Sequence, residues 1–170
     1  MSDFSAAYHL KTDNQEDVVN LLKRAELTGY VFEPVNGWVT FVTQIDKSNS
    51  DTKITDHNNG VLLFLYRTSD FLGWGFSIFE KDSLIGKYAI SADEEENLKI
   101  TNSLDNSILS QIVDTTKIDS LTELLNPPNV EIAYEKGDFE FANIIGLVNI
   151  EYVSFAQIDC NIEDYEVEKV

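Results

Sequence analysis

The hydrophobic residues at the start of the chain follow first the spacing of a strand and then that of a helix. Residues 6–10 form a short apolar run typical of a strand. Residues 13–16 have the spacing of a helix-capping box. Apolar residues then recur every three or four positions, as on one face of a helix, at Val18, Leu21, Leu22 and Ala25. We therefore expect a strand followed by a helix, which Gly29 ends.

A β-hairpin is predicted next. Two runs rich in β-branched and aromatic residues, 30–35 and 38–43, flank the dipeptide Asn36-Gly37. Both of these residues tolerate the positive φ that a two-residue hairpin turn requires. Pro34 has no N–H to donate to a neighbouring strand, so the first run should lie at a sheet edge or end early. The opening order is therefore β-α-β-β.

Three further runs predict an antiparallel meander of strands. Residues 61–67 are almost continuously apolar, residues 74–80 alternate, and residues 84–90 follow after a short turn. The face of the second run that carries Trp74, Phe76 and Ile78 should point to the core, and its other face should be only partly covered.

Residues 44–59 are polar and rich in Asp, Asn, Ser and Thr, and they are many for an unstructured connection inside a compact domain. We expect this loop to be either mobile or functional. It does not match a calcium loop, because Asp51 stands where the turn needs Gly and His57 stands where a Glu should close the site.

After residue 91 the pattern predicts mainly helices. Asp138 is placed to cap a short helix that Gly146 ends. Residues 148–155 are the last strand candidate, and the acidic residues 159–170 should be solvated and frayed. Two earlier apolar stripes have helical spacing, and Pro127-Pro128 stops the second; they are Leu104, Ile108 and Ile112, then Ile118, Leu121 and Leu125.

Together these segments predict an α+β fold. We expect a mostly antiparallel sheet of five to seven strands, opening β-α-β-β and continuing as a three-strand meander, with the helices packed on one face. No linker divides the chain, so residues 1–170 should form a single domain. Its parts are a strand-rich segment 1–91, a helix-rich segment 92–147, and a final strand with an acidic tail at 148–170.

The charge balance limits the possible partners. The chain has 12 basic and 30 acidic side chains and a net charge of −18. Such a charge disfavours binding to nucleic acids and to anionic membranes, so any partner should be a basic protein. No apolar run approaches the roughly 20 residues of a membrane-spanning helix. With one cysteine and no signal-peptide pattern at the start, we expect a cytoplasmic protein without a disulfide.

The sequence shows no catalytic or cofactor-binding motif. The two histidines are His9, expected to be structural in the first strand, and His57, in the polar loop. Acidic residues follow Cys160 and should blunt its reactivity. There is no nucleophile elbow, phosphate-binding loop or zinc motif, so we expect no cofactor and no metal. Carboxylates alone could form a reactive pair, and their spacing selects none.

Two groups of residues are candidates for contacts with a partner. Asp70, Phe71 and Leu72 lie in a predicted turn between two strands, where a tight hairpin would expose them; the turn could also fold back over the sheet. The second group is an acidic run at Asp93, Glu94, Glu95 and Glu96.

Residues 141–155, with a helix, a glycine and an aromatic-ended run, resemble the closing segment of small acidic bacterial proteins, some of them similar to immunity proteins that block a toxin. The resemblance implies a bacterial, non-enzymatic role. Our first hypothesis is therefore an immunity-like or regulatory protein that binds a basic partner. The alternative is a carboxylate-based or metal-dependent enzyme with two or more acids converging in a pocket. A third hypothesis, mimicry of nucleic-acid charge, needs acids in rows.

Overall fold

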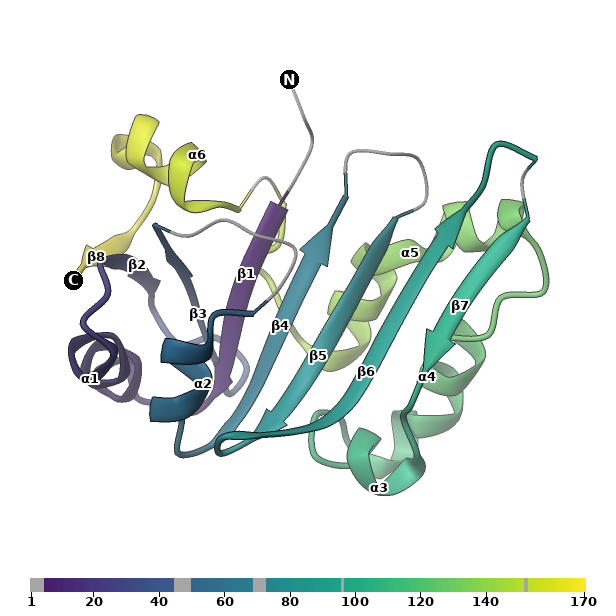
Figure 1. The fold of residues 1–170 in the computed structure, drawn as a ribbon, viewed down its shortest axis with the longest axis horizontal. Helices are drawn as coiled ribbons and strands as arrows, with labels where there is room; N and C mark the ends of the chain where they lie inside the picture. The colour runs from purple at the N-terminus through teal and green to yellow at the C-terminus, as the bar shows by residue number, and fades with distance from the viewer. Residues whose placement is uncertain (1–4, 45–49, 69–72, 96, 152) are drawn as a thin grey trace.

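One antiparallel sheet of eight strands forms the centre of the molecule, in the order β7-β6-β5-β4-β1-β3-β2-β8 (Figure 1). The computed structural model describes residues 5–44, 50–68, 73–95, 97–151 and 153–170, with the main chain alone at 134–136. The strands are β1 Ser5–Lys11, β2 Gly29–Phe32, β3 Trp38–Thr43, β4 Val61–Arg67, β5 Trp74–Glu80, β6 Ser83–Ala92, β7 Leu98–Asn102 and β8 Val167–Lys169. The sheet is open, and β7 and β8 are its two edges.

Helices cover both faces of the sheet. The first face carries α1 and α2, and the second carries α3, α4 and α5, with α6 beside β2 (Figure 1). Among the described residues, no helix has the length and apolar character needed to cross a membrane. The helices are α1 Gln15–Ala25, α2 Thr52–His57, α3 Asn106–Leu109, α4 Ile118–Leu124, α5 Val130–Ile145 and α6 Phe155–Cys160, with 3-10 helices η1 Thr115–Lys117 and η2 Ile162–Asp164.

The first face is packed by α1. It begins within the predicted segment, but its N-cap is Asn14, whose side chain accepts a hydrogen bond from the Glu16 N–H, and not Asp13 as the capping-box spacing implies. It ends earlier than predicted, at Ala25, where Glu26 adopts a left-handed φ of 55°. Gly29 instead opens β2, and a Cβ there would lie 2.5 Å from the Val42 carbonyl oxygen. Gly29 is therefore needed for the close approach of β3, not to end the helix.

The second face holds the larger core. Phe76 of β5 stacks on Phe141 of α5 with ring centroids 4.3 Å apart, and Trp74 and Tyr88 adjoin this pair. These four aromatic side chains are at most 5% exposed. Burying such large rings stabilises this layer.

The prediction that helices pack on one face is wrong. Strands β1, β3 and β4 carry buried side chains on both faces: Tyr8 packs under α1, while the neighbouring Ala7 and His9 are buried on the opposite face. A strand that is apolar on both faces must be covered on both, so helices had to occupy each side.

The sheet has eight strands where we expected five to seven. The two extra strands are β7, which lies in the segment predicted to be helical, and β8, which lies in the tail predicted to be frayed. Both are edge strands with mostly exposed side chains, so they lack the apolar pattern that reveals an inner strand. Conversely, 148–155 is not a strand: its described residues are irregular until α6 begins at Phe155.

The order of the other strands is confirmed, but β5 is buried on both faces, so the prediction that the face of Gly75, Ser77 and Phe79 is only partly covered is wrong. The opening β-α-β-β order and the adjacent strands β4, β5 and β6 are present. Asn36 and Gly37 have φ of 53° and 80°, as the hairpin turn requires. β2 ends at Phe32, before Pro34, in agreement with the proline argument.

The predicted short helix is present as the second part of α5, and Asp138 stands at its start. Gly137, with φ 24° and ψ −156°, separates it from a first part whose N-cap is Asn129. The Asp138 carboxylate accepts hydrogen bonds from the Arg67 guanidinium at 2.6–2.9 Å, which ties α5 to the end of β4. The guanidinium also lies 4.5 Å from the centre of the exposed Phe139 ring. Gly146 ends α5 with φ 87°, as predicted.

A double-mutant cycle distinguishes the ion pair from a helix cap. We expect Arg67→Met and Asp138→Asn each to lower the free energy of unfolding. The double variant should lose about 1–2 kcal/mol less than the sum of the two single losses, because both substitutions remove the same ion pair. Urea denaturation measures the three values. Additive losses would show that Asp138 acts independently of Arg67.

Candidate functional site

The acidic run predicted to contact a partner lies at the turn between β6 and β7. Asp93 Oδ1 accepts hydrogen bonds from the backbone N–H of Asn97 at 2.9 Å and of Glu95 at 3.0 Å. These bonds, chiefly the one from Asn97, lower the pKa of Asp93 and keep it charged. Glu94 and Glu95 are exposed, and Glu96 lies outside the described residues. Asp93 thus fixes the turn and leaves two glutamates in solvent.

The other predicted group, Asp70, Phe71 and Leu72, lies outside the described residues. The structure shows only how the connection is anchored: the Thr68 N–H donates to the Gly73 carbonyl at 2.7 Å. Exposure of Phe71 and Leu72 stays a prediction.

The strand next to the acidic turn has a free edge. Ser103 N–H donates to the Lys87 carbonyl, and Asp93 N–H donates to the Asn97 carbonyl. These contacts identify alternate residues of β7, namely Lys99 and Thr101, as the ones hydrogen-bonded to β6. The N–H and C=O groups of the residues between them therefore point away from the sheet; these residues are Leu98, Ile100 and Asn102.

This edge is accessible. Leu98 is half-buried and the other four residues of β7 are exposed, with Ile100 at 39%. Sequence reasoning missed the strand, although Leu98-Lys99-Ile100-Thr101 alternates apolar and polar residues. That alternation is the signal that could have revealed it.

The opposite edge, β8, is also acidic. Glu168 is exposed on the strand, Glu166 is exposed just before it, and Glu163 and Asp164 are exposed on the preceding 3-10 helix. Gly29 and Val170 exchange two backbone hydrogen bonds, so within β8 it is Glu168 that bonds to β2. Val167 and Lys169 therefore direct their N–H and C=O groups away from the sheet.

The histidines serve the fold. His9 is completely buried, and its Nδ1 lies 2.9 Å from Thr40 Oγ1, while Nε2 has no partner among the described residues. Burial lowers the pKa of His9 to about 3, so the ring is neutral at pH 7. His57 Nδ1 donates to the Lys53 carbonyl within α2. His9 shares the lining of a cavity of about 10 Å³ with Tyr66 and with Asp138, whose carboxylate is hydrogen-bonded to Arg67.

The largest hollow is a groove of about 770 Å³ where the end of α5 meets η1 and the β2–β3 turn. Its polar groups bind the last carbonyls of α5: Lys117 Nζ donates to Ile144, Trp38 Nε1 to Ile145, and Asn36 Nδ2 to Gly146. These donors satisfy the helix end and match its negative dipole. The groove is a helix-capping arrangement with one carboxylate, that of Asp114.

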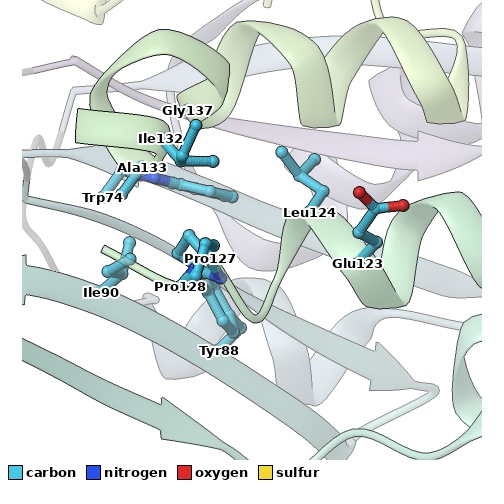
Figure 2. Close-up of a pocket in the computed structure, with 10 residues that line it drawn as sticks. All are labelled: Trp74, Tyr88, Ile90, Glu123, Leu124, Pro127, Pro128, Ile132, Ala133 and Gly137. Atoms are coloured by element: carbon cyan, nitrogen blue, oxygen red, sulfur yellow. The ribbon is translucent and has the colours of Figure 1, made fainter. Parts of the chain in front are cut away.

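A smaller cavity, of about 30 Å³, lies between the sheet and the α4–α5 connection, with Trp74, Tyr88, Pro127 and Pro128 in its wall (Figure 2). Burial raises the pKa of Tyr88, whose hydroxyl has no hydrogen-bond partner among the described residues. Glu123 is the single carboxylate in its lining.

The four described pockets do not offer the pair of acids that the enzyme hypothesis requires. Each is lined by one carboxylate: Glu123, Asp114, Asp17 or Asp138. Among the described residues, no group of three or more His, Cys, Asp or Glu side chains could hold a metal ion.

Comparisons with protein-family models, with curated proteins and with solved structures found no match to the chain.

Burial of His9 makes stability depend on pH. The pKa is about 3 in the folded state and about 6.5 when unfolded, so the unfolded state binds the extra proton between these values. The contribution of neutral His9 is complete above pH 6.5 and falls as the pH drops towards 3, by up to about 1.4 kcal/mol per pH unit. Urea denaturation from pH 7 to 4 should show a shallower loss in His9→Gln than in the unmodified chain. The same dependence of the unfolding free energy on pH in both proteins would contradict this.

Proposed function

We propose that the chain is a non-catalytic protein-binding protein that engages a basic partner at its acidic corner, defined as the Asp93–Glu95 turn together with β7. The observation that carries this proposal is the arrangement of the turn: Asp93 is held by backbone N–H groups, which presents the exposed Glu94 and Glu95 on a fixed support. An immunity-like role, in which the partner is a toxin, is one form of this proposal.

The charge distribution supports a partner of opposite sign. Three ion pairs occur among the described residues: Arg67–Asp138, Lys99–Asp93 and Lys169–Asp159. The remaining acidic side chains contribute an unneutralised surface to a chain of net charge −18. A basic protein would be attracted from a distance, and its association would accelerate at low salt.

The acidic corner also offers apolar contact. Ile100 is 39% exposed on β7, within a few residues of the two glutamates. Binding sites commonly combine a small apolar centre with a charged rim, where the apolar contact holds the partner and the charges select it. The corner provides both in one hairpin.

Affinity capture with a matched control tests this proposal. The unmodified chain should retain a basic polypeptide at an ionic strength of about 0.01 M and release most of it at about 0.15 M, because salt screens the attraction. Glu94→Gln/Glu95→Gln should weaken the binding of that purified polypeptide about tenfold.

The control is Glu166→Gln/Glu168→Gln, just before and on β8, which removes the same charge from the opposite edge and should change affinity by less than about threefold. Failure to retain any basic polypeptide at low salt, or equal losses in both variants, would count against the acidic corner.

A further inference from the structure

The backbone of β7 is arranged to accept another strand. Leu98, Ile100 and Asn102 direct their N–H and C=O groups outward, and no strand of the described structure pairs with them. Unpaired edge groups of this kind are the usual template for strand addition. The exposure of four of the five residues shows that no helix covers this edge.

We propose that the basic partner binds by adding an extended segment to β7 as a ninth strand of the sheet. This inference rests on the proposed function and specifies how the partner is recognised. Main-chain hydrogen bonds to Leu98, Ile100 and Asn102 provide the affinity, and side chains at alternate positions provide the selectivity.

The side chains around β7 define the chemistry of the segment. On the second face of the sheet, Ile100 is opposite Ile90 in the ladder and partly exposed, so an apolar residue of the segment covers it. Lys99 and Thr101 lie on the first face, so the residues of the added segment beside them should be polar. Acidic residues stand beyond both ends of the strand, at the Asp93–Glu95 turn and at Asp105, so basic residues belong at both ends of the segment.

The edge at β8 fits such a segment less well. It directs the backbone of only two residues outward, and one of them is Lys169, whose ammonium lies 3.5 Å from Asp159 and over the Tyr30 ring. β7 directs the backbone of three residues outward, and none of the three is charged. The lysine of β7, Lys99, bonds inward to β6 and lies 3.9 Å from Asp93, so this edge offers more hydrogen bonds to a basic strand.

A second copy of the chain is the alternative occupant, and charge opposes it. Antiparallel pairing of two β7 strands about Ile100 would place Glu95 of one copy opposite Asp105 of the other, which sets like charges across the ladder. Each copy also carries a net charge of −18. The complementary partner is therefore a basic strand.

Amide hydrogen exchange tests the backbone contacts directly. In the free protein the amides of Leu98, Ile100 and Asn102 should exchange fast, and those of Lys99 and Thr101 slowly, because only the latter bond to β6. The probe is a synthetic peptide of alternating valine and threonine with two lysines at each end. It should slow exchange at the three outward amides about tenfold or more; no slowing at up to about 1 mM peptide would overturn the inference.

A proline variant separates this inference from the proposed function. Ile100→Pro removes an outward N–H and none of the hydrogen bonds to β6, so the fold should remain while peptide affinity falls about tenfold. Ile100→Thr keeps the N–H and should lose less than about threefold. Melting temperatures of both variants verify the fold, and the exchange measurement on the unmodified chain does not depend on it.

The outcomes are distinct. If Ile100→Pro binds as tightly as the unmodified chain while Glu94→Gln/Glu95→Gln binds weakly, strand addition is wrong and the acidic corner still binds a basic partner. If sedimentation shows a dimer that Ile100→Pro dissociates, a second copy occupies the edge and the inference is overturned. If neither variant changes binding, the proposed function fails as well.

Discussion

An antiparallel sheet that does not close must end in two strands whose alternate backbone groups have no partner in the sheet. Here those strands are β7 and β8, which differ in length and in how they are joined to the rest of the fold. β8 is short and is joined to the body by α6, whose Asp159 accepts a hydrogen bond from Tyr30 on β2. β7 is longer, and its exposed residues leave its outer backbone open to a partner. The open edge is thus a consequence of sheet topology as well as of local sequence.

The enclosed polar groups mostly serve the fold. The groove at the end of α5 contains two lysines, but Lys117 binds the Ile144 carbonyl and Lys11 binds the Gln111 carbonyl. The Asp138 carboxylate is paired with the Arg67 guanidinium, and His9 is neutral and buried. Groups that have already found structural partners in this way are poor candidates for catalysis, since a reaction would have to compete with those contacts. Three buried polar atoms have no hydrogen-bond partner among the described residues: His9 Nε2, Thr43 Oγ1 and the Tyr88 hydroxyl oxygen.

The sequence predicted the interior of the fold better than its edges. The runs at 61–67 and 74–80 gave the strands β4 and β5 with their bounds, because buried strands need apolar side chains that leave a clear pattern. β7 and β8 bury little, so neither has the apolar run of an inner strand, and β7 shows only the short alternation at 98–101. The candidate site was predicted in part: the acidic run was located from composition, whereas the free backbone beside it depends on the register with β6, which no single-sequence pattern encodes.

The structure also divides the acidic residues by type, which sharpens the interpretation of the charge. Several aspartates accept backbone N–H bonds at turns and helix starts, as Asp51, Asp105 and Asp114 do. A short side chain reaches its own backbone easily, which is why aspartate favours these positions. Within the described ranges no glutamate carboxylate accepts a hydrogen bond, so the longer side chains extend into solvent. In the acidic turn the same division holds: Asp93 builds the support, and Glu94 and Glu95 present the charge that a basic strand would meet.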